Sequence, residues 1–381
     1  MKIHFYSPNR IHAWNYNNVY VHGIGGSETS HVEMAVRLAA RGHEVVSYTD
    51  LPKDDPDFDP RAMGVHWLDL TDANLEDDGL WVIYRAPEVG LEAKSRPGRR
   101  FWLVCQDVFY FSWTAEAVAA FDRIFALCPD HRADMIQRDP SVADRVVLSS
   151  NGVNVEAIEA AEAEVGPGER NPKRLIWASS PDRGLKETLD IFERAREIVT
   201  DLELHVFYGL DNIAKVCGGN RHLPPWDKTW RQYERACAMP GVTWHGRIGQ
   251  DALRREWFKS GIWLYPTWFS ETSCIACMEA QACGAIPITR PFWAVGWNVR
   301  HGGVFVEGDP NEPLIKARYV AALVAIASDP DGQEAIRARM MPRARVDFDW
   351  DRWAEQWELL GLVDMGEVER MGLEATAEVP A

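Results

Sequence analysis

The sequence has no apolar run that approaches the roughly 18 consecutive residues of a membrane-spanning helix. Its first residues, MKIHFYSPNR, turn polar too early for a secretory signal peptide. We therefore expect a cytoplasmic protein without integral membrane contact. Basic charge is also scarce, because 41 Lys and Arg residues stand against 57 Asp and Glu residues, for a net charge of −16. This balance disfavours tight nonspecific binding to nucleic acid or to anionic lipid.

Metal-binding patterns are missing as well. The chain has seven cysteines, which a cytoplasmic location predicts to be reduced thiols. Cys274, Cys277 and Cys283 fall in an Ala-rich helical run without a second C-x-x-C pair, so we interpret them as packing residues. The D-x-D strings at 57–59 and 347–349 are expected by chance in so acidic a chain. We expect no metal site and no cofactor.

A complete dinucleotide-binding fingerprint is absent too. From Gly23 the pattern G-x-G-x-x-G continues at Gly25, but its last position is occupied by Glu28. A long polar and aromatic loop also separates these glycines from the first strand-like run, residues 2–7. Gly25 and Gly26 instead stand at the start of a helix, where bare backbone and free N–H groups favour an anion or a polarised hydroxyl. A turn without a ligand is the alternative.

One basic cluster stands out from the acidic background. It consists of Lys94, Arg96, Arg99 and Arg100, just before a strand-like run. The main interpretation is a solvated loop, and contact with phosphate or a membrane surface is the alternative.

Strand-like and helical runs alternate along the whole chain of 381 residues. Most of the strand-like runs are apolar on both faces, as buried parallel strands are. The alternation pauses at the acidic, then Gly- and Pro-rich stretch EAAEAEVGPGERNPK, which we interpret as a linker, and then restarts. The pattern predicts two Rossmann-like open parallel-sheet α/β domains facing a cleft, at 1–165 and 166–345, followed by a closing helix and an acidic tail at 346–381.

The stretch YPTWFSETSCIACMEAQACGAIPIT, residues 265–289, combines features of a ligand site. A strand ends at Pro266, a polar loop follows, and a helix is predicted from about Ser273 to Cys283. Glu271 precedes this helix, and the helix start offers N–H groups to an anion. Glu279 lies two turns further along an otherwise apolar helix, where a buried carboxylate needs a hydrogen-bonding partner. Sugar hydroxyls would satisfy that need.

Glu271 and Glu279 form an E-x7-E pair that, with EAQACGAIPIT, resembles the signature of retaining nucleotide-sugar glycosyltransferases of the GT-B fold, family 4 group. The segments GIGGSE, SSNGVN, ASSPDRGLKETLDIF and GVTWHGRIGQ resemble further parts of that family in the same order. The resemblance covers nearly the whole chain. It implies a hexosyl- or pentosyltransferase that needs no metal and uses a nucleotide sugar, with UDP as the first guess.

The resemblance also implies roles for individual residues. Glu271 would contact the donor sugar and Glu279 the ribose, while Arg183 and Lys186 would neutralise phosphate charge. Glu271, Arg183 and Lys186 would have the catalytic roles. The remaining donor-binding candidates are Gly25, Gly26, Ile248, Thr272, Ser273 and Cys274.

Two positions depart from the family pattern. Ala178 stands near the place of a frequent arginine, and Arg183 takes the place of the usual lysine. Gln106, followed by Asp107, stands where the family often has a histidine. Gln106, Asp107 and Trp14 are possible sugar or acceptor contacts.

The function predicted in this way is transfer of a sugar to an acceptor hydroxyl. The acceptor would be a saccharide or a modified DNA base of the phage type, although the acidic charge disfavours DNA. A nucleotide-sugar epimerase or phosphorylase on the same fold, and a nucleotide-sugar binding protein without turnover, are the alternatives. The sequence says nothing of the oligomeric state.

Overall fold

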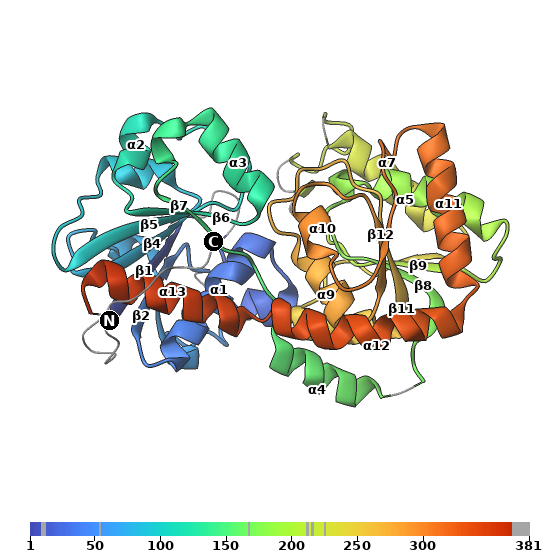
Figure 1. The fold of residues 1–381 in the computed structure, drawn as a ribbon, viewed down its shortest axis with the longest axis horizontal. Helices are drawn as coiled ribbons and strands as arrows, with labels where there is room; N and C mark the ends of the chain where they lie inside the picture. Colours follow the sequence, from blue (N-terminus) through green and yellow to red (C-terminus); the bar gives the residue numbers. More distant parts are fainter. Residues whose placement is uncertain are drawn as a thin grey trace. The chain divides into compact units, whose positions relative to one another are not determined.

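The computed structural model describes residues 1–8, 13–52, 55–166, 168–210, 213–214, 217–224 and 226–367. They form two compact units, each with its own parallel sheet (Figure 1). Unit 1 contains Met1–Asn17, Ser27–Ser150 and the chain from Trp350 onward. Unit 2 contains Asn18–Gly26 and Asn151–Asp349. The chain therefore enters unit 2 before the predicted boundary at residue 165, and the glycine loop belongs to unit 2.

Unit 1 is built on a seven-stranded sheet with the strand order β3-β2-β1-β4-β5-β6-β7. All of its pairings are parallel, and all residues of β4 are buried, as the two-sided apolar runs predict. The strands are β1 (Lys2–Ser7), β2 (Glu44–Thr49), β3 (Val65–Asp69), β4 (Gly79–Tyr84), β5 (Arg99–Val104), β6 (Arg123–Ala126) and β7 (Val146–Leu148). The helices are α1 (Gly26–Ala40), α2 (Ala115–Ala119), α3 (Pro129–Arg138) and α13 (Trp350–Met365).

Unit 2 is built on a six-stranded parallel sheet with the order β10-β9-β8-β11-β12-β13. The strands are β8 (Asn171–Trp177), β9 (Glu203–Val206), β10 (Val242–Trp244), β11 (Ser260–Tyr265), β12 (Ile286–Thr289) and β13 (Val304–Phe305). The helices are α4 (Val155–Val165), α5 (Leu185–Arg196), α7 (Asp227–Ala238), α8 (Gln250–Lys259), α9 (Ile275–Cys283), α10 (Trp293–Asn298), α11 (Pro313–Ala327) and α12 (Pro330–Asp347). The strand order reverses between β8 and β11, so the loops that follow these two strands start side by side.

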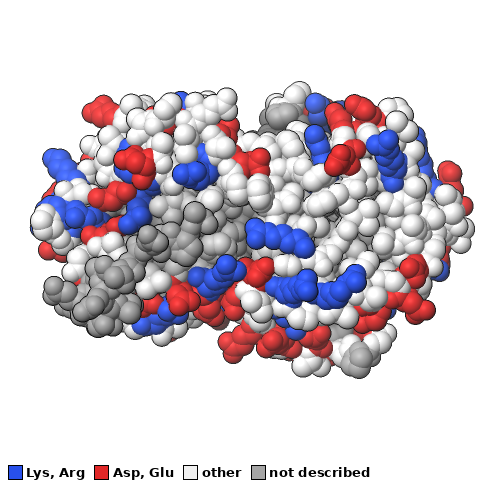
Figure 2. Space-filling view, in the orientation of Figure 1, with Lys and Arg blue, Asp and Glu red and all other residues white. Residues whose placement is uncertain are grey.

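Part of the predicted linker is helical. Residues 155–165 form α4, which packs on α8, so only the Gly- and Pro-rich part after this helix connects elements. Figure 2 shows acidic side chains gathered over α4, whose sequence carries Glu156, Glu159, Glu162 and Glu164. A polar face of this kind explains why the stretch resembles a linker in sequence: the apolar side of the helix is narrow.

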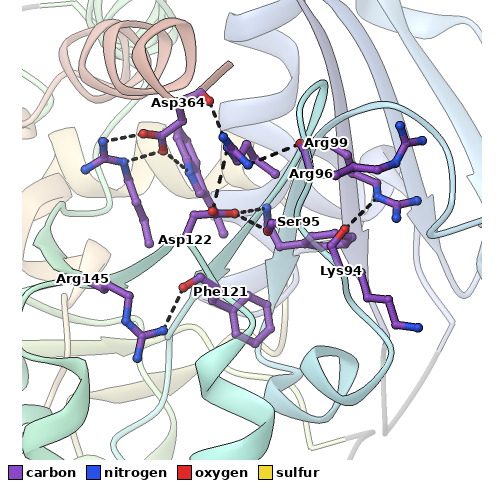
Figure 3. Close-up of polar contacts among 12 residues, drawn as sticks. Lys94, Ser95, Arg96, Arg99, Phe121, Asp122, Arg145 and Asp364 are labelled. Atoms are coloured by element: carbon purple, nitrogen blue, oxygen red, sulfur yellow. Dashed lines mark hydrogen bonds and ion pairs between the residues drawn. The ribbon is translucent and has the colours of Figure 1, made fainter. Parts of the chain in front are cut away.

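The C-terminal helix α13 belongs to unit 1 and contacts β4 and β5. Trp357 packs its ring against Phe125 at 4.9 Å and against Trp102 at 6.1 Å between ring centroids. Near the end of the helix, the Asp364 carboxylate accepts two hydrogen bonds of 2.6 Å from Arg123 (Figure 3). The acidic tail predicted beyond this helix lies, from residue 368, outside the described residues.

The basic cluster spans the turn before β5 and the first two residues of that strand, and it is part of a network of polar contacts (Figure 3). Arg96 contacts Asp78 at 2.6 Å, and Arg99 contacts Glu76 at 2.8 Å. Arg100 donates through Nε to the backbone carbonyl of Asp364 at 3.0 Å. These arginines are engaged within unit 1, which disfavours phosphate or membrane contact. The interpretation as a solvated loop is corrected at Arg99, which is 2% exposed and belongs to β5. No helix among the described residues is both long and apolar enough to cross a membrane.

Candidate functional site

The loops after β8 and β11 bring Arg183, Phe269 and Glu271 together in unit 2. Arg183 ends a 3-10 turn at Pro181–Arg183, and its guanidinium carbon lies 3.2 Å from the centroid of the Phe269 ring. The next residue, Gly184, has a φ of +123°, and a Cβ there would stand 2.8 Å from the Pro266 carbonyl oxygen. Glycine is therefore required for the two loops to pack, and their packing positions Arg183.

Glu271 is half-buried and held by Tyr265, the last residue of β11. The Tyr265 hydroxyl donates to Glu271 Oε1 at 2.6 Å. Burial raises the pKa of Glu271, and the charge of Arg183 partly opposes this rise. Burial, and then the neighbouring Glu271, raises the pKa of Tyr265 well above its ordinary value, so the hydroxyl stays a donor at neutral pH. We call Arg183, Tyr265, Phe269 and Glu271 the donor cluster.

Helix α9 starts next to the donor cluster, two residues later than predicted. Its N-cap, Cys274, has φ 59° and ψ 72°, a left-handed conformation that costs energy for a residue with a Cβ. Ser273 is buried; its hydroxyl accepts from the Asn151 amide at 3.1 Å and its carbonyl accepts from Asn298. Thr272 is also buried. The strained start of α9 is thus held by contacts on both sides.

Glu279 lies inside α9 and is 6% exposed. Its Oε2 accepts a hydrogen bond from Trp257 Nε1 of α8 at 3.2 Å. This bond gives the buried carboxylate one of the hydrogen-bonding partners that it requires. Glu271 and Glu279 thus differ in setting: Glu271 lies in the loop before α9, and Glu279 is a buried residue of the helix.

Lys186 does not join the donor cluster through any described contact. It is 54% exposed at the side chain, and its Nζ lies 3.3 Å from Asp190 and 3.8 Å from Glu187, both on the same helix, α5. Asp190 also accepts from Lys316 and Arg235, at 2.5 Å each. The Lys186 ammonium group therefore forms its ion pairs with carboxylates of its own helix.

The glycine loop packs against the end of β10 and the start of α8, within unit 2. A Cβ at Gly23 would collide with the carbonyl of Ile248, and Arg247 donates to the Gly23 carbonyl at 3.4 Å. Gly23, with a φ of +75°, is thus required for packing. Gly25 and Gly26 are exposed, and a Cβ at Gly26 would meet only the Ile275 side chain at 3.4 Å. Their predicted approach to a ligand stays a prediction.

A second polar cluster lies in unit 1, at the carboxyl ends of β4 and β5. Arg85 directly follows β4, and its guanidinium contacts Asp107 Oδ2 at 2.7 Å, Ser27 Oγ at 3.1 Å and Glu28 Oε1 at 3.5 Å. Burial lowers the pKa of Arg85, but the carboxylates of Asp107 and Glu28 outweigh burial and raise this pKa above its ordinary value. Gln106 donates from Nε2 to Ser30 Oγ at 3.2 Å. We call Ser27, Glu28, Arg85, Gln106 and Asp107 the strand-end cluster.

Arg85 and Glu28 are site candidates that the sequence did not indicate. Arg85 is one of four described non-glycine residues with a positive φ, at 58°, and Cys274 is another. Positive φ at such residues is concentrated at functional sites. The signal available in the sequence was the position of Arg85 directly after a buried strand, whereas Gln106 was indicated by the family resemblance.

Trp14 corrects the prediction of a stacking face. Its side chain is fully buried and packs edge-on against His31, with ring centroids 5.3 Å apart. The indole is therefore a core residue that presents no face to a ligand. Among the described residues, no group of three or more His, Cys, Asp or Glu side chains is arranged to hold a metal ion.

No protein-family model and no curated protein sequence matches the chain. Solved structures do match. A sucrose-phosphate synthase from Thermosynechococcus elongatus is 15% identical over 97% of this chain and 98% of its own, with a TM-score of 0.69. Anabaena HepE in complex with UDP-glucose is 15% identical over 94% and 99%, with a TM-score of 0.67. A glycosyltransferase from Rickettsia africae is 12% identical over 96% and 98%, with a TM-score of 0.63. The chain shares the fold of these proteins, which confirms the predicted GT-B fold class with two parallel-sheet α/β units.

Proposed function

We propose that this protein is a glycosyltransferase that moves a sugar from a UDP-sugar to an acceptor hydroxyl. The observation that carries the proposal is the donor cluster, in which Arg183 and Glu271 meet at the carboxyl ends of β8 and β11, beside the start of α9. A cation and a helix start at this edge suit a diphosphate, and a carboxylate suits sugar hydroxyls. The fold shared with HepE, solved with UDP-glucose, supports UDP as the nucleotide.

The donor would lie on unit 2. Arg183 stabilises the charge that develops on the leaving diphosphate, and the N–H groups near Cys274 add to this. Glu271, kept in place by Tyr265, orients the sugar through its hydroxyls, and Glu279 contacts the ribose. Gly25, Gly26 and Ile248 complete the donor contacts. Lys186 joins them when its Asp190 contact exchanges for phosphate.

We further propose a retaining reaction without a metal. The bond from the anomeric carbon to the diphosphate oxygen breaks, and the acceptor oxygen forms its bond on the same face of the sugar. The acceptor proton passes to the leaving phosphate, so no side chain has to serve as a general base. Arg183 then provides the positive charge that stabilises the leaving group.

The first experiment is a thermal-shift panel of UDP-, GDP-, ADP- and dTDP-sugars, with each stabilising ligand then tested for slow hydrolysis. A ligand at about 100 times its Kd adds roughly 2.7 kcal/mol, enough to raise the melting temperature by a few degrees. A UDP-sugar that both stabilises and is hydrolysed supports a transferase. Interconversion of one UDP-sugar into its epimer favours an epimerase, and binding without turnover, with every acceptor tried, favours a binding protein.

Arg183→Ala tests the phosphate role directly. We expect kcat for donor hydrolysis or transfer to fall by roughly 10²–10³-fold, since one donor to developing charge is lost. Arg183→Lys keeps the positive charge but loses the paired N–H donors of the guanidinium group. Its kcat should lie between those of the wild type and Arg183→Ala. Lys228→Ala, on α7 of the same unit, is the control for loss of a positive charge elsewhere. Unchanged hydrolysis by Arg183→Ala would contradict the assigned site.

A further inference from the structure

Unit 1 contains a pocket of about 210 Å³ beside the strand-end cluster. The loop after β5 and helix α3 enclose it, and aromatic side chains of that loop form much of its lining. The volume is below the ~300–1,000 Å³ of pockets for drug-sized ligands, so the pocket suits a single ring.

Two phenylalanines of the pocket are strongly exposed. Phe111 is 93% exposed and Phe109 is 58% exposed, and their rings meet edge to face with centroids 5.0 Å apart. Trp113 is fixed nearby by a hydrogen bond from its Nε1 to Asp139 at 3.0 Å. Adjacent exposed aromatic rings at the mouth of a pocket are typical of a surface that is covered by a ligand.

The pocket lining also includes a buried histidine of α3. His131 is fully buried and lines the pocket. Its Nδ1 accepts from the Leu127 amide at 3.3 Å, which places the proton of the neutral ring on Nε2. Burial lowers the pKa of His131 to about 4, an effect that a hydrogen bond with the Asp107 backbone opposes only in part, so the ring is neutral at pH 7. The neutral ring adds no charge to the pocket.

The charged groups at the pocket are already balanced within unit 1. Arg138 is paired with Asp134 and donates to the Val108 carbonyl, and Asp107 is paired with Arg85. A nucleic-acid backbone needs cations that are available to its phosphates. The balance therefore favours a neutral ligand.

We propose that this pocket binds one neutral sugar ring of the acceptor, which stacks on Phe109 and Phe111. The proposal rests on the proposed function, because a transferase needs an acceptor, and it names a saccharide rather than a DNA base. Phe109 and Phe111 then determine acceptor specificity and leave donor chemistry unchanged.

The test is ligand-observed saturation-transfer NMR on the full-length protein. The probes are a panel of methyl glycosides, and thymidine and deoxycytidine as the nucleobase arm. The variants are Phe109→Ala and Phe111→Ala, and the matched control is Phe305→Ala, which removes a phenylalanine of unit 2 that is 43% exposed. UDP-glucose binding is measured separately on the same samples, so that failure of the donor site is recognised independently of failure of this pocket.

We expect a methyl glycoside to bind the wild type and Phe305→Ala equally, and to bind Phe111→Ala and Phe109→Ala about tenfold more weakly. Their UDP-glucose affinity should not change. A nucleoside that binds in place of the glycosides, with the same sensitivity to these variants, would overturn the sugar assignment. Absence of binding by every probe, or glycoside binding that Phe111→Ala leaves unchanged, would overturn the pocket itself.

Discussion

At the scale of single residues, Arg183 and Glu271 lie near enough for the charge of one to influence the other, although 88 positions separate them in the sequence. The two loops that carry them follow neighbouring strands, and Gly184 allows the loops to touch. The arginine also packs on Phe269, which restricts its guanidinium before any ligand arrives. A preorganised cation of this kind stabilises developing charge without reorganisation at the moment of reaction.

Glu271→Ala should reduce sugar transfer by at least about 10²-fold, because charged hydrogen bonds to the sugar are lost. The free energy of unfolding should change little, since Glu271 is only half-buried. Steady-state kinetics with the donor identified by thermal shift provides the measurement. Tyr265→Phe is the matched control, because it removes only the hydroxyl that orients Glu271, and should reduce kcat less. Wild-type transfer rates in Glu271→Ala would exclude it from the site.

His31 predicts a pH dependence of stability that has nothing to do with the site. The ring is fully buried, bonded through Nε2 to Ser47 Oγ at 2.7 Å, and burial lowers its pKa to about 3. Between pH 6.5 and pH 3 the unfolded chain binds a proton that the folded chain does not. The contribution of His31 is therefore present above pH 6.5 and is lost as the pH falls toward 3.

Urea unfolding at several pH values measures this effect. Relative to His31→Gln, the wild type should lose up to about 1.4 kcal/mol of unfolding free energy for each pH unit below 6.5. Parallel curves for the two proteins over this range would show that His31 does not titrate as its burial implies.

At the scale of elements, α9 is a helix with an unusual start. Most of its residues are buried, so the helix is anchored on all sides, and the chain reaches it through Cys274 in the left-handed region. Its N-terminus lies directly after the loop of the donor cluster. The backbone conformation of Cys274 sets the direction of the first N–H groups of α9. The packing of α9 holds Cys274 in this strained conformation.

Cys274→Gly should relieve this strain, whereas Cys274→Ala should retain it. We expect the glycine variant to be roughly 1 kcal/mol more stable than the alanine variant, as measured by chemical denaturation. Both variants remove the same thiol, so the comparison isolates the backbone. Equal stabilities, or a more stable alanine variant, would contradict a strained start of α9. Donor affinity, measured alongside, reports whether the strained conformation contributes to binding.

At the scale of the whole molecule, the two units do not correspond to two consecutive segments of the chain. The chain enters unit 2 for residues 18–26, returns to unit 1, and comes back to unit 1 a second time with α13. Unit 1 is thus completed only by the end of the chain, where Trp357 covers the sheet and Asp364 bonds Arg123 and Trp102 Nε1, the latter at 2.8 Å (Figure 3).

Asp364→Ala should destabilise unit 1 by about 2 kcal/mol, because Arg123 and Trp102 lose their shared, largely buried acceptor. The matched control is Asp351→Ala at the start of the same helix. Asp351 is 64% exposed at its side chain and 3.3 Å from Arg37, so its loss should cost less than about 1 kcal/mol. The difference appears in urea unfolding midpoints. Equal effects would show that α13 is held by its tryptophans alone.

The sequence alone determined the strands and much of the helix pattern. Each strand of both sheets overlaps a strand-like run of the sequence, because a strand buried on both faces has to be apolar. Strand β8 starts earlier than its run, at Asn171, inside the stretch interpreted as a linker. The sequence also determined the fold class, and it named Arg183 and Glu271 through the resemblance. The pattern does not predict helix α12, because Pro342 and several arginines interrupt its narrow apolar side, and it predicts a linker at part of α4 for a similar reason.

Only the tertiary structure decided what each candidate touches. Trp14 became a core residue, Lys186 paired within α5, and Arg85 joined Asp107 in the strand-end cluster. The physical reason is that such pairings depend on side-chain direction and on contacts distant in sequence, which a periodic pattern does not encode. Strand formation is a local response to burial, whereas a site is assembled by loops that meet only after the sheets have formed.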